Sequence, residues 1–248
     1  MSTGVFQPAV SHLNAKGHNH RVRKVLINGT KYSMMAVLPI AVAYFIVGDS
    51  FIALWVGQKY ASAGHTVLII LTIAVIANVS QYTSTQILQG IARHGSIAYI
   101  TIAEAAANLC LSIFLVRKFG INGAAIGTLI PMLLSNLVFI PWYTCREVDL
   151  SLSRFFKEGL LIPCIPAVIF GLILFAVSRV LGVDTWIRFI LVITACTASY
   201  SYFAWYICLT KPERLERWRD LTNAIGSGLV FARSVILSVR SRVEKTIP

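Results

Sequence analysis

Long apolar runs dominate this chain, and the charged residues fall mainly between them. A helix that spans a bilayer needs about 20 mostly apolar residues. Four runs without any Asp, Glu, Lys or Arg reach that length, at residues 60–92, 119–145, 159–178 and 189–210. Together with the remaining apolar segments, the pattern predicts an all-α membrane bundle of about six transmembrane helices, near residues 32–56, 66–91, 96–116, 121–144, 159–179 and 186–209.

Glycine and proline residues occur between and within the apolar runs. Gly120 and Gly123 lie in the short segment between the third and fourth predicted spans and indicate a tight turn there. Proline inside a membrane helix frees a backbone carbonyl that a neighbouring helix or water must satisfy. The predicted spans contain several such prolines, which are Pro39, Pro131, Pro141, Pro163 and Pro166. Kinked helices of this kind are common in transporters.

Composition supports a membrane protein and excludes several other classes. Only 13% of the 248 residues are charged, whereas 56% are hydrophobic; soluble domains average about 25% charged residues. The net charge of +12 does not indicate nucleic-acid binding, because the basic residues lie at span ends and in the terminal segments, where they contact lipid. The five cysteines form no CxxC pair, and no Walker A, HExxH or GxSxG motif occurs. We therefore expect no cofactor, no metal and no enzymatic activity.

The distribution of Lys and Arg predicts the domain organisation and the orientation. With six spans, 17 of these residues fall on one side of the membrane and 5 on the other. Basic residues favour the cytoplasmic side, so both termini are predicted to be cytoplasmic. Residues 1–31 form a cytoplasmic loop or amphipathic segment, residues 32–209 form the transmembrane bundle, and residues 210–248 form a basic amphipathic tail at the membrane surface.

One face of the third predicted span is polar. Its members follow one another at helical spacings of three or four residues, and they are Thr101, Glu104, Asn108 and Ser112. A carboxylate near the middle of a bilayer costs at least about 2.5–3.5 kcal/mol on insertion scales, so Glu104 must face a cavity, a partner or the bundle interior. Two interpretations stay open: a cavity wall that contacts sugar hydroxyls or a coupling cation, or a hydrogen bond between helices.

The second predicted span carries a similar polar face. Its members are Asn78, Tyr82, Thr85 and Gln89, with Arg93 just beyond the span end. Amides and phenols hydrogen-bond sugar hydroxyls without carrying charge, which favours a substrate cavity. Polar contacts between helices, worth about 0.6 kcal/mol on average, are the competing explanation.

Several segments resemble polysaccharide exporters. FQPAVSHLNAKG, followed by a basic stretch and YSMMAVLPIAV, resembles the loop and helix that open the C-terminal half of these proteins, and LWVGQKYASAG resembles the end of the next helix. The most extensive match is EAAANLCLSIFLVRKFGINGAAIGTLIP, Glu104 to Pro131, with its glutamate–asparagine helix, basic pair and Gly-Ile-x-Gly turn. The chain thus resembles the polysaccharide flippases of the multidrug/oligosaccharidyl-lipid/polysaccharide exporter superfamily over most of residues 5–175.

This resemblance implies a function. Such flippases rock two helical bundles about a central cavity and carry a lipid-linked oligosaccharide, usually on undecaprenyl diphosphate, across the bacterial inner (cytoplasmic) membrane. The chain is expected to be one half of this two-bundle fold, the C-terminal one, acting with a missing N-terminal half or a second bundle. A fragment, a split subunit and a homodimer all fit that expectation.

Two other functions are compatible with the sequence. A multidrug or lipid II exporter of the same superfamily is one, although a cavity for lipid II would need several arginines and Arg93 is the single candidate for that role. A membrane enzyme of polysaccharide assembly is the other, but it would need large outer loops, and the predicted outer loops are short.

Overall fold

The computed structural model describes residues 19–209 and 214, which form helices joined by short turns, with no strand in that part of the chain. The chain divides into two compact units, 1–207 and 208–248, and the fold below is that of the first. The prediction of an amphipathic tail falls on residues outside the described part. The helices are α2 (Asn19–Trp55), η1 (Gln58–Tyr60), α3 (Ala61–Ser80), α4 (Tyr82–Gly90), α5 (His94–Leu134), η2 (Ser135–Phe139), α6 (Ile140–Glu147), α7 (Leu152–Phe155), η3 (Phe156–Leu161), α8 (Ile162–Leu181) and α9 (Trp186–Ile207).

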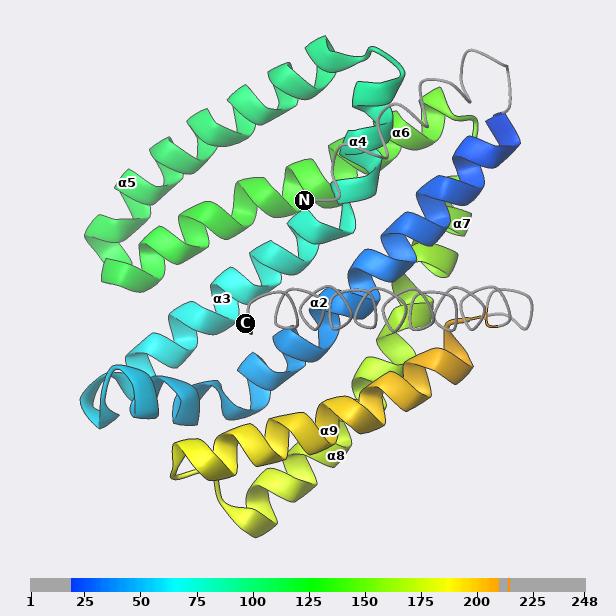
Figure 1. The fold of residues 1–248 in the computed structure, drawn as a ribbon. Coiled ribbons are helices and arrows are strands. Elements are labelled where there is room, and N and C mark those ends of the chain that lie inside the picture. Colours follow the sequence, from blue (N-terminus) through cyan, green and yellow to red (C-terminus); the bar gives the residue numbers. More distant parts are fainter. Residues whose placement is uncertain (1–18, 210–213, 215–248) are drawn as a thin grey trace, which may run out of the picture. The chain divides into compact units, whose positions relative to one another are not determined.

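Five helical stretches of the described residues are long and apolar enough to cross a membrane, so the predicted all-α membrane bundle is confirmed. The longest, His94–Glu147, has 54 residues and would extend about 80 Å if it were straight. It reverses at Gly120, whose φ of 59° is in the left-handed region that glycine adopts easily. Figure 1 shows the two arms of α5 returning side by side. The predicted span 96–116 lies in the first arm, and the predicted span 121–144 covers the second arm together with η2 and the first part of α6.

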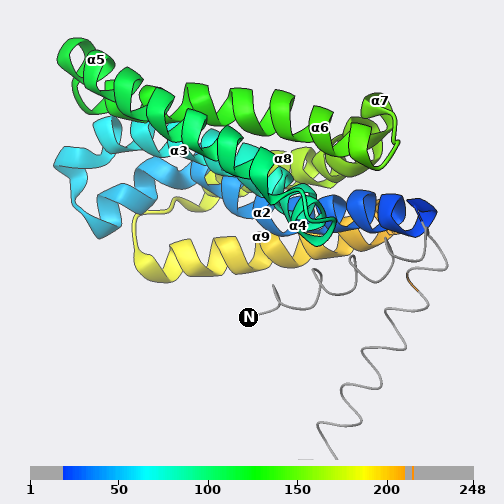
Figure 2. The ribbon, with the colours of Figure 1, turned by 90° about the horizontal axis from the view of Figure 1, so that it is seen from above.

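Helix α2 is the centre of the bundle. It packs against α3, α4, α8 and α9, and the α5–α6 hairpin and α9 lie on opposite sides of it (Figures 1 and 2). One core cluster joins Met34 and Leu38 of α2 to Phe170 of α8 and Tyr200 of α9. The Tyr200 hydroxyl donates a hydrogen bond to the carbonyl oxygen of Met35 over 2.9 Å, so the buried phenol has an acceptor.

Helix α2 begins earlier than the predicted span. The sequence predicts a first span from about residue 32, whereas α2 is already helical from Asn19 onwards. The additional turns bury Val22 and Leu26 against Ile87 of α4 and Phe155 of α7 in a second core cluster. The helix continues outside the apolar run because this one face packs against other helices, a contact that the local pattern does not reveal.

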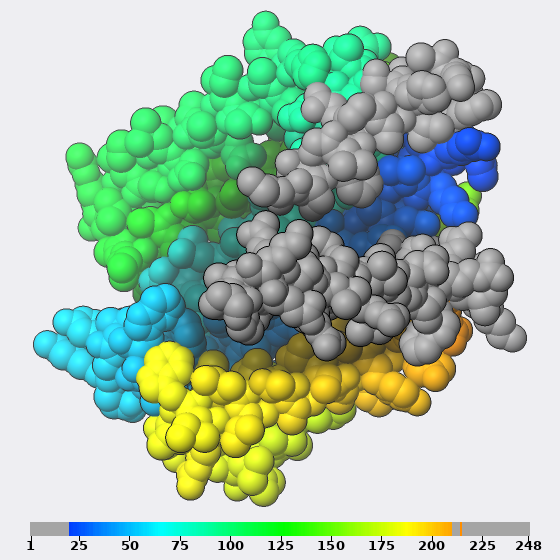
Figure 3. Space-filling model, in the orientation of Figure 1, coloured from blue at the N-terminus to red at the C-terminus, as the bar shows by residue number. Residues whose placement is uncertain are grey.

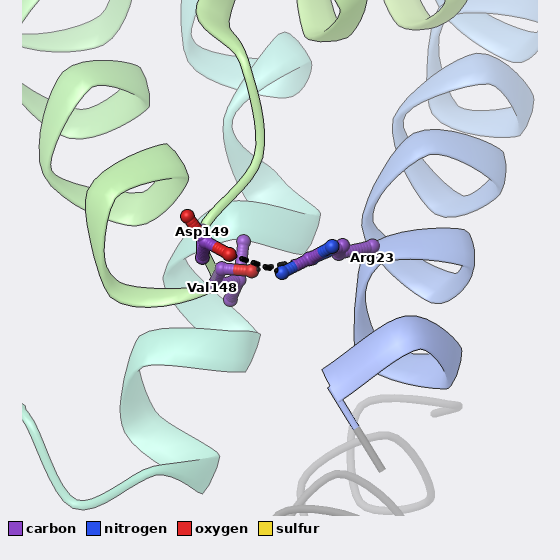
Figure 4. Close-up of polar contacts among 3 residues, drawn as sticks. All are labelled: Arg23, Val148 and Asp149. Atoms are coloured by element: carbon purple, nitrogen blue, oxygen red, sulfur yellow. Dashed lines mark hydrogen bonds and ion pairs between the residues drawn. The ribbon is translucent and has the colours of Figure 1, made fainter.

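Charged residues join the helix ends on the side of the bundle where α2 begins. Arg23 donates from Nε to the carbonyl oxygen of Val148 and from Nη2 to Asp149, both over 2.7 Å. Figure 4 shows this side chain reaching from α2 to the loop after α6. Asp149 has a φ of 53°, a conformation that Asp adopts more readily than most residues. Arg93 forms a second ion pair with Glu147, at 3.3 Å, so the end of α6 is held from two directions.

Candidate functional site

Glu104 contacts the opposite arm of the hairpin. The Ser135 hydroxyl donates a hydrogen bond to Oε2 of Glu104. In a straight helix these residues would lie roughly 46 Å apart, so the contact depends on the reversal at Gly120. Ser135 is also the first residue of the π-helical turn η2 (Ser135–Phe139), and π-turns inside helices occur frequently at functional sites. The carboxylate is therefore held beside an irregular stretch of backbone.

An apolar groove of about 380 Å³ opens at this contact. Glu104 and Ser135 are its polar members, and the rest of its wall comes from Tyr99, Ile100, Ala103, Ala107, Pro131, Leu134 and Phe139. Among the residues that the structure describes, no Lys, Arg or His lines the groove. Glu104 is half-buried, and an ionisable side chain within a membrane-spanning segment generally faces a cavity or a polar partner.

Other described helices cover little of the surface of the first arm of α5. None of residues 94–119 is buried, and Tyr99 and Ile102 have 78% and 66% of their surface exposed. In the space-filling view this arm follows the edge of the helical unit (Figure 3). The groove with Glu104 therefore lies on a face of the hairpin that other described helices leave open.

Asn108 and Ser112 form hydrogen bonds within the α5 hairpin. Ser112 donates to Oδ1 of Asn108 over 2.9 Å, and Thr128 of the opposite arm donates to the same oxygen over 3.3 Å. Ser112 also lies 3.4 Å from the carbonyl oxygen of Ala124. These bonds favour the interpretation of Asn108 and Ser112 as contacts between helices. Thr128 is not among the predicted site residues, although it lies in the segment from Glu104 to Pro131 that carries the family resemblance.

The polar faces of the second and third spans meet only in part. Gln89 and Thr101 line one cavity of about 390 Å³, together with His94 and Ile97. Thr101 is thus near Gln89 and does not line the groove of Glu104. The predicted face from Thr101 to Ser112 is divided among three surroundings, because the helix passes α4 first and its own second arm afterwards.

The other candidates in the second span do not join Glu104. Asn78 and Tyr82 are exposed, and the Thr85 hydroxyl donates to the backbone carbonyl of Gln81 over 3.0 Å. Arg93 is engaged by Glu147. Of the nine predicted site residues, Glu104 alone lines the apolar groove.

Gln81 is a buried polar residue that the sequence pattern does not include among the predicted site residues. It lies between α3 and α4, where the helix is interrupted, and has only 1% of its surface exposed. Its amide nitrogen donates to Ser80 over 3.1 Å and its amide oxygen accepts from Ser84 over 2.9 Å. The sequence places Gln81 beside the predicted polar face, and the run Gln-Tyr-Thr-Ser-Thr was the available signal. A buried amide that is hydrogen-bonded at both its nitrogen and its oxygen fixes the position of the interruption.

Comparison with known proteins finds distant similarity to membrane proteins, two of which are named as probable flippases. It is 24% identical over 238 residues to a protein of Bacillus subtilis named uncharacterized membrane protein EpsK, with 89% of the chain and 44% of that protein aligned. It is 23% identical over 217 residues to the probable flippase AglR of Haloferax volcanii, with 85% and 44% aligned. The probable low-salt glycan biosynthesis flippase Agl15 of the same organism is 26% identical over 121 residues, 49% of the chain and 25% of that protein.

No family model matches the chain, and no solved structure matches it. The chain spans less than half of the length of each of these three relatives. With its long apolar helices, the chain is a multi-pass, polysaccharide flippase-like membrane protein, and the resemblance predicted from its motifs is confirmed.

Proposed function

We propose that this protein takes part in flipping a lipid-linked oligosaccharide across the bacterial cytoplasmic membrane for cell-surface polysaccharide synthesis. The observation that carries the proposal is the alignment of most of the chain with a protein named as a probable flippase. A second such protein, matching about half of the chain, is named for glycan biosynthesis. The proposed carrier is undecaprenyl diphosphate, as the resemblance of the motifs implies.

The open face of the α5 hairpin supports a translocation path along this part of the bundle. Glu104 is half-buried at the level of the membrane-spanning segments, and the groove beside it is not closed by other described helices. Ionisable residues at such depth generally face a cavity and mark substrate or ion pathways. We assign Glu104 to the wall of the path, with Gln89 and Thr101 as hydrogen-bonding groups at one end of it.

A second bundle would supply the opposite wall. In transporters built from two repeats, the substrate site lies at the interface between them, and this chain aligns with 44% of the length of EpsK and of AglR. We therefore propose that the chain works beside another bundle, either in one longer protein or as a separate subunit. The uncovered arm of α5 provides a surface for that contact.

Complementation tests the need for a second bundle. In a host that lacks its own flippase, residues 1–248 alone should restore less than about a tenth of the surface polysaccharide that a complete relative restores. A fusion of the chain to the first half of such a relative should restore most of it. Membrane levels of both proteins must be matched by immunoblotting. Full restoration by the chain alone would contradict the proposal of a second, different bundle.

Reporter fusions test the proposed orientation with both termini in the cytoplasm. The 17-to-5 distribution of Lys and Arg favours this topology. Alkaline phosphatase, which is active only outside the cytoplasm, should be at least tenfold more active when fused at Ser62 than when fused at Pro248. A cytoplasmic fluorescent reporter should give the reverse order. High phosphatase activity at Pro248 would overturn the topology.

A further inference from the structure

A polar cleft of about 460 Å³ lies at the end of the bundle where α2 begins. One wall is a single face of α2, because its members are spaced by three and four residues along the helix. These members are His20, Arg23, Lys24, Ile27 and Asn28. Three of the five side chains can be cationic, and the Asn28 amide adds an uncharged hydrogen-bond donor.

The opposite wall comes from the loop after α6 and from α7 and η3. Ser151, Arg154 and Glu158 follow one another at spacings of three and four residues and face the cleft with Asp149 and Leu150. The two walls thus bring groups together that are more than 120 residues apart in the sequence, as the bond between Arg23 and Asp149 shows directly (Figure 4).

The charges of the cleft do not cancel. Asp149 pairs with Arg23 and Glu158 pairs with Arg154, at 2.7 and 2.8 Å. Lys24 also lines the cleft and forms no ion pair with another described residue. The cleft therefore carries one more positive than negative charge before His20 is counted. Because the two arginines are held in place by their carboxylates, Lys24 is the cation left to attract an anion.

The cleft also has an apolar part and lies near the membrane surface. Ile27 and Leu150 contribute apolar wall beside the charged groups. The predicted span begins at Tyr32, roughly 12 Å from Lys24 along a helix that rises about 1.5 Å per residue. This distance corresponds to the level of the lipid headgroups outside the hydrocarbon core. Basic pockets between membrane helices at this level bind anionic headgroups.

We propose that this cleft binds the phosphate of an anionic membrane lipid, with Lys24 as the main charged contact and Asn28 and Ser151 as additional hydrogen-bond donors. The same phosphate chemistry is available from a bilayer phospholipid and from a prenyl phosphate carrier. The proposal does not depend on the translocation function, because it rests on the charges and position of the cleft alone.

The test uses the full chain in nanodiscs. Its melting temperature is measured against the mole fraction of phosphatidylglycerol in a phosphatidylcholine bilayer. Lys24→Gln should shift the midpoint of this stabilisation to about fivefold more phosphatidylglycerol, the factor expected for one basic residue near the surface. Lys157→Gln is the matched control, because Lys157 is exposed on the neighbouring helix turn but does not line the cleft. It should shift the midpoint by less than twofold.

Two further measurements distinguish the source of the phosphate. Undecaprenyl phosphate is added at a few mole per cent to a phosphatidylcholine nanodisc, and inorganic phosphate is added to the same nanodisc at millimolar concentration. Stabilisation by either lipid that is lost in Lys24→Gln supports the proposal and names the source. Equal midpoints in wild type, Lys24→Gln and Lys157→Gln would overturn it, and so would stabilisation by inorganic phosphate alone.

Discussion

Gly123→Ala should destabilise the protein by about 2–3 kcal/mol or more, although it adds only one methyl group. A Cβ at this position would overlap the backbone carbonyl of Leu115 on the other arm of the hairpin, so the arms would have to separate. Overfilling a well-packed contact typically costs 1–3 kcal/mol. Lipid tails are as apolar as leucine, so close approach between small residues carries much of helix association in a membrane. The measurement is unfolding in detergent by thermal scan or SDS titration.

Gly95→Ala is the matched control for this substitution. Gly95 also lies in α5, but no atom comes within 4 Å of a Cβ built there. Alanine lowers the conformational entropy of the unfolded chain, so this variant should be unchanged or more stable by up to about 1 kcal/mol. If Gly123→Ala and Gly95→Ala melted at the same temperature, the close contact between the two arms would be wrong.

Glu104→Gln should reduce polysaccharide export by tenfold or more in the fused transporter, with normal amounts of protein in the membrane. The amide keeps the shape of the side chain and can still accept a hydrogen bond from Ser135, but it cannot take up or release a proton. A purely structural contact would survive this change. The measurement is surface polysaccharide per transporter molecule, with the melting temperature determined on the same preparations.

Ser135→Ala and Asp184→Asn are the accompanying variants. Ser135→Ala removes the hydrogen-bond donor and leaves the Glu104 carboxyl group, so it separates loss of the contact from loss of the titratable group. Asp184 is a largely exposed carboxylate in the segment between α8 and α9 and does not line the groove; its amide variant should export normally. Equal export by wild type and Glu104→Gln would leave Glu104 only a hydrogen-bonding role.

The polar face of the third span shows how far a local pattern reaches. Helical spacing correctly places Thr101, Glu104, Asn108 and Ser112 along one arm, but it does not state which neighbour each side chain meets. In the structure Asn108 bonds to Thr128, Glu104 bonds to Ser135, and Thr101 lines a cavity with Gln89. When a helix packs against several neighbours along its length, the residues on one of its faces lie in several different environments.

The sequence by itself determined the class of fold and the turn at Gly120. Apolar run length is a property of each segment alone, because lipid requires every spanning backbone to satisfy its hydrogen bonds within its own helix. The turn at Gly120 likewise depends on local sequence, because a glycine between two such runs can adopt a positive φ. The motifs around Glu104 to Pro131 also sufficed to indicate the flippase-like class that the relatives confirm.

Only the tertiary structure decided which polar groups meet. The groove at Glu104 and the cleft at Lys24 join residues separated by about 30 and more than 120 positions. Such contacts depend on the reversal of α5 and on the packing of α2 against distant helices. Their energies come from short-range packing and hydrogen bonding between segments. The pattern of residues within one segment does not contain these packing and hydrogen-bond energies, because the partner of each side chain depends on which other helix packs against it.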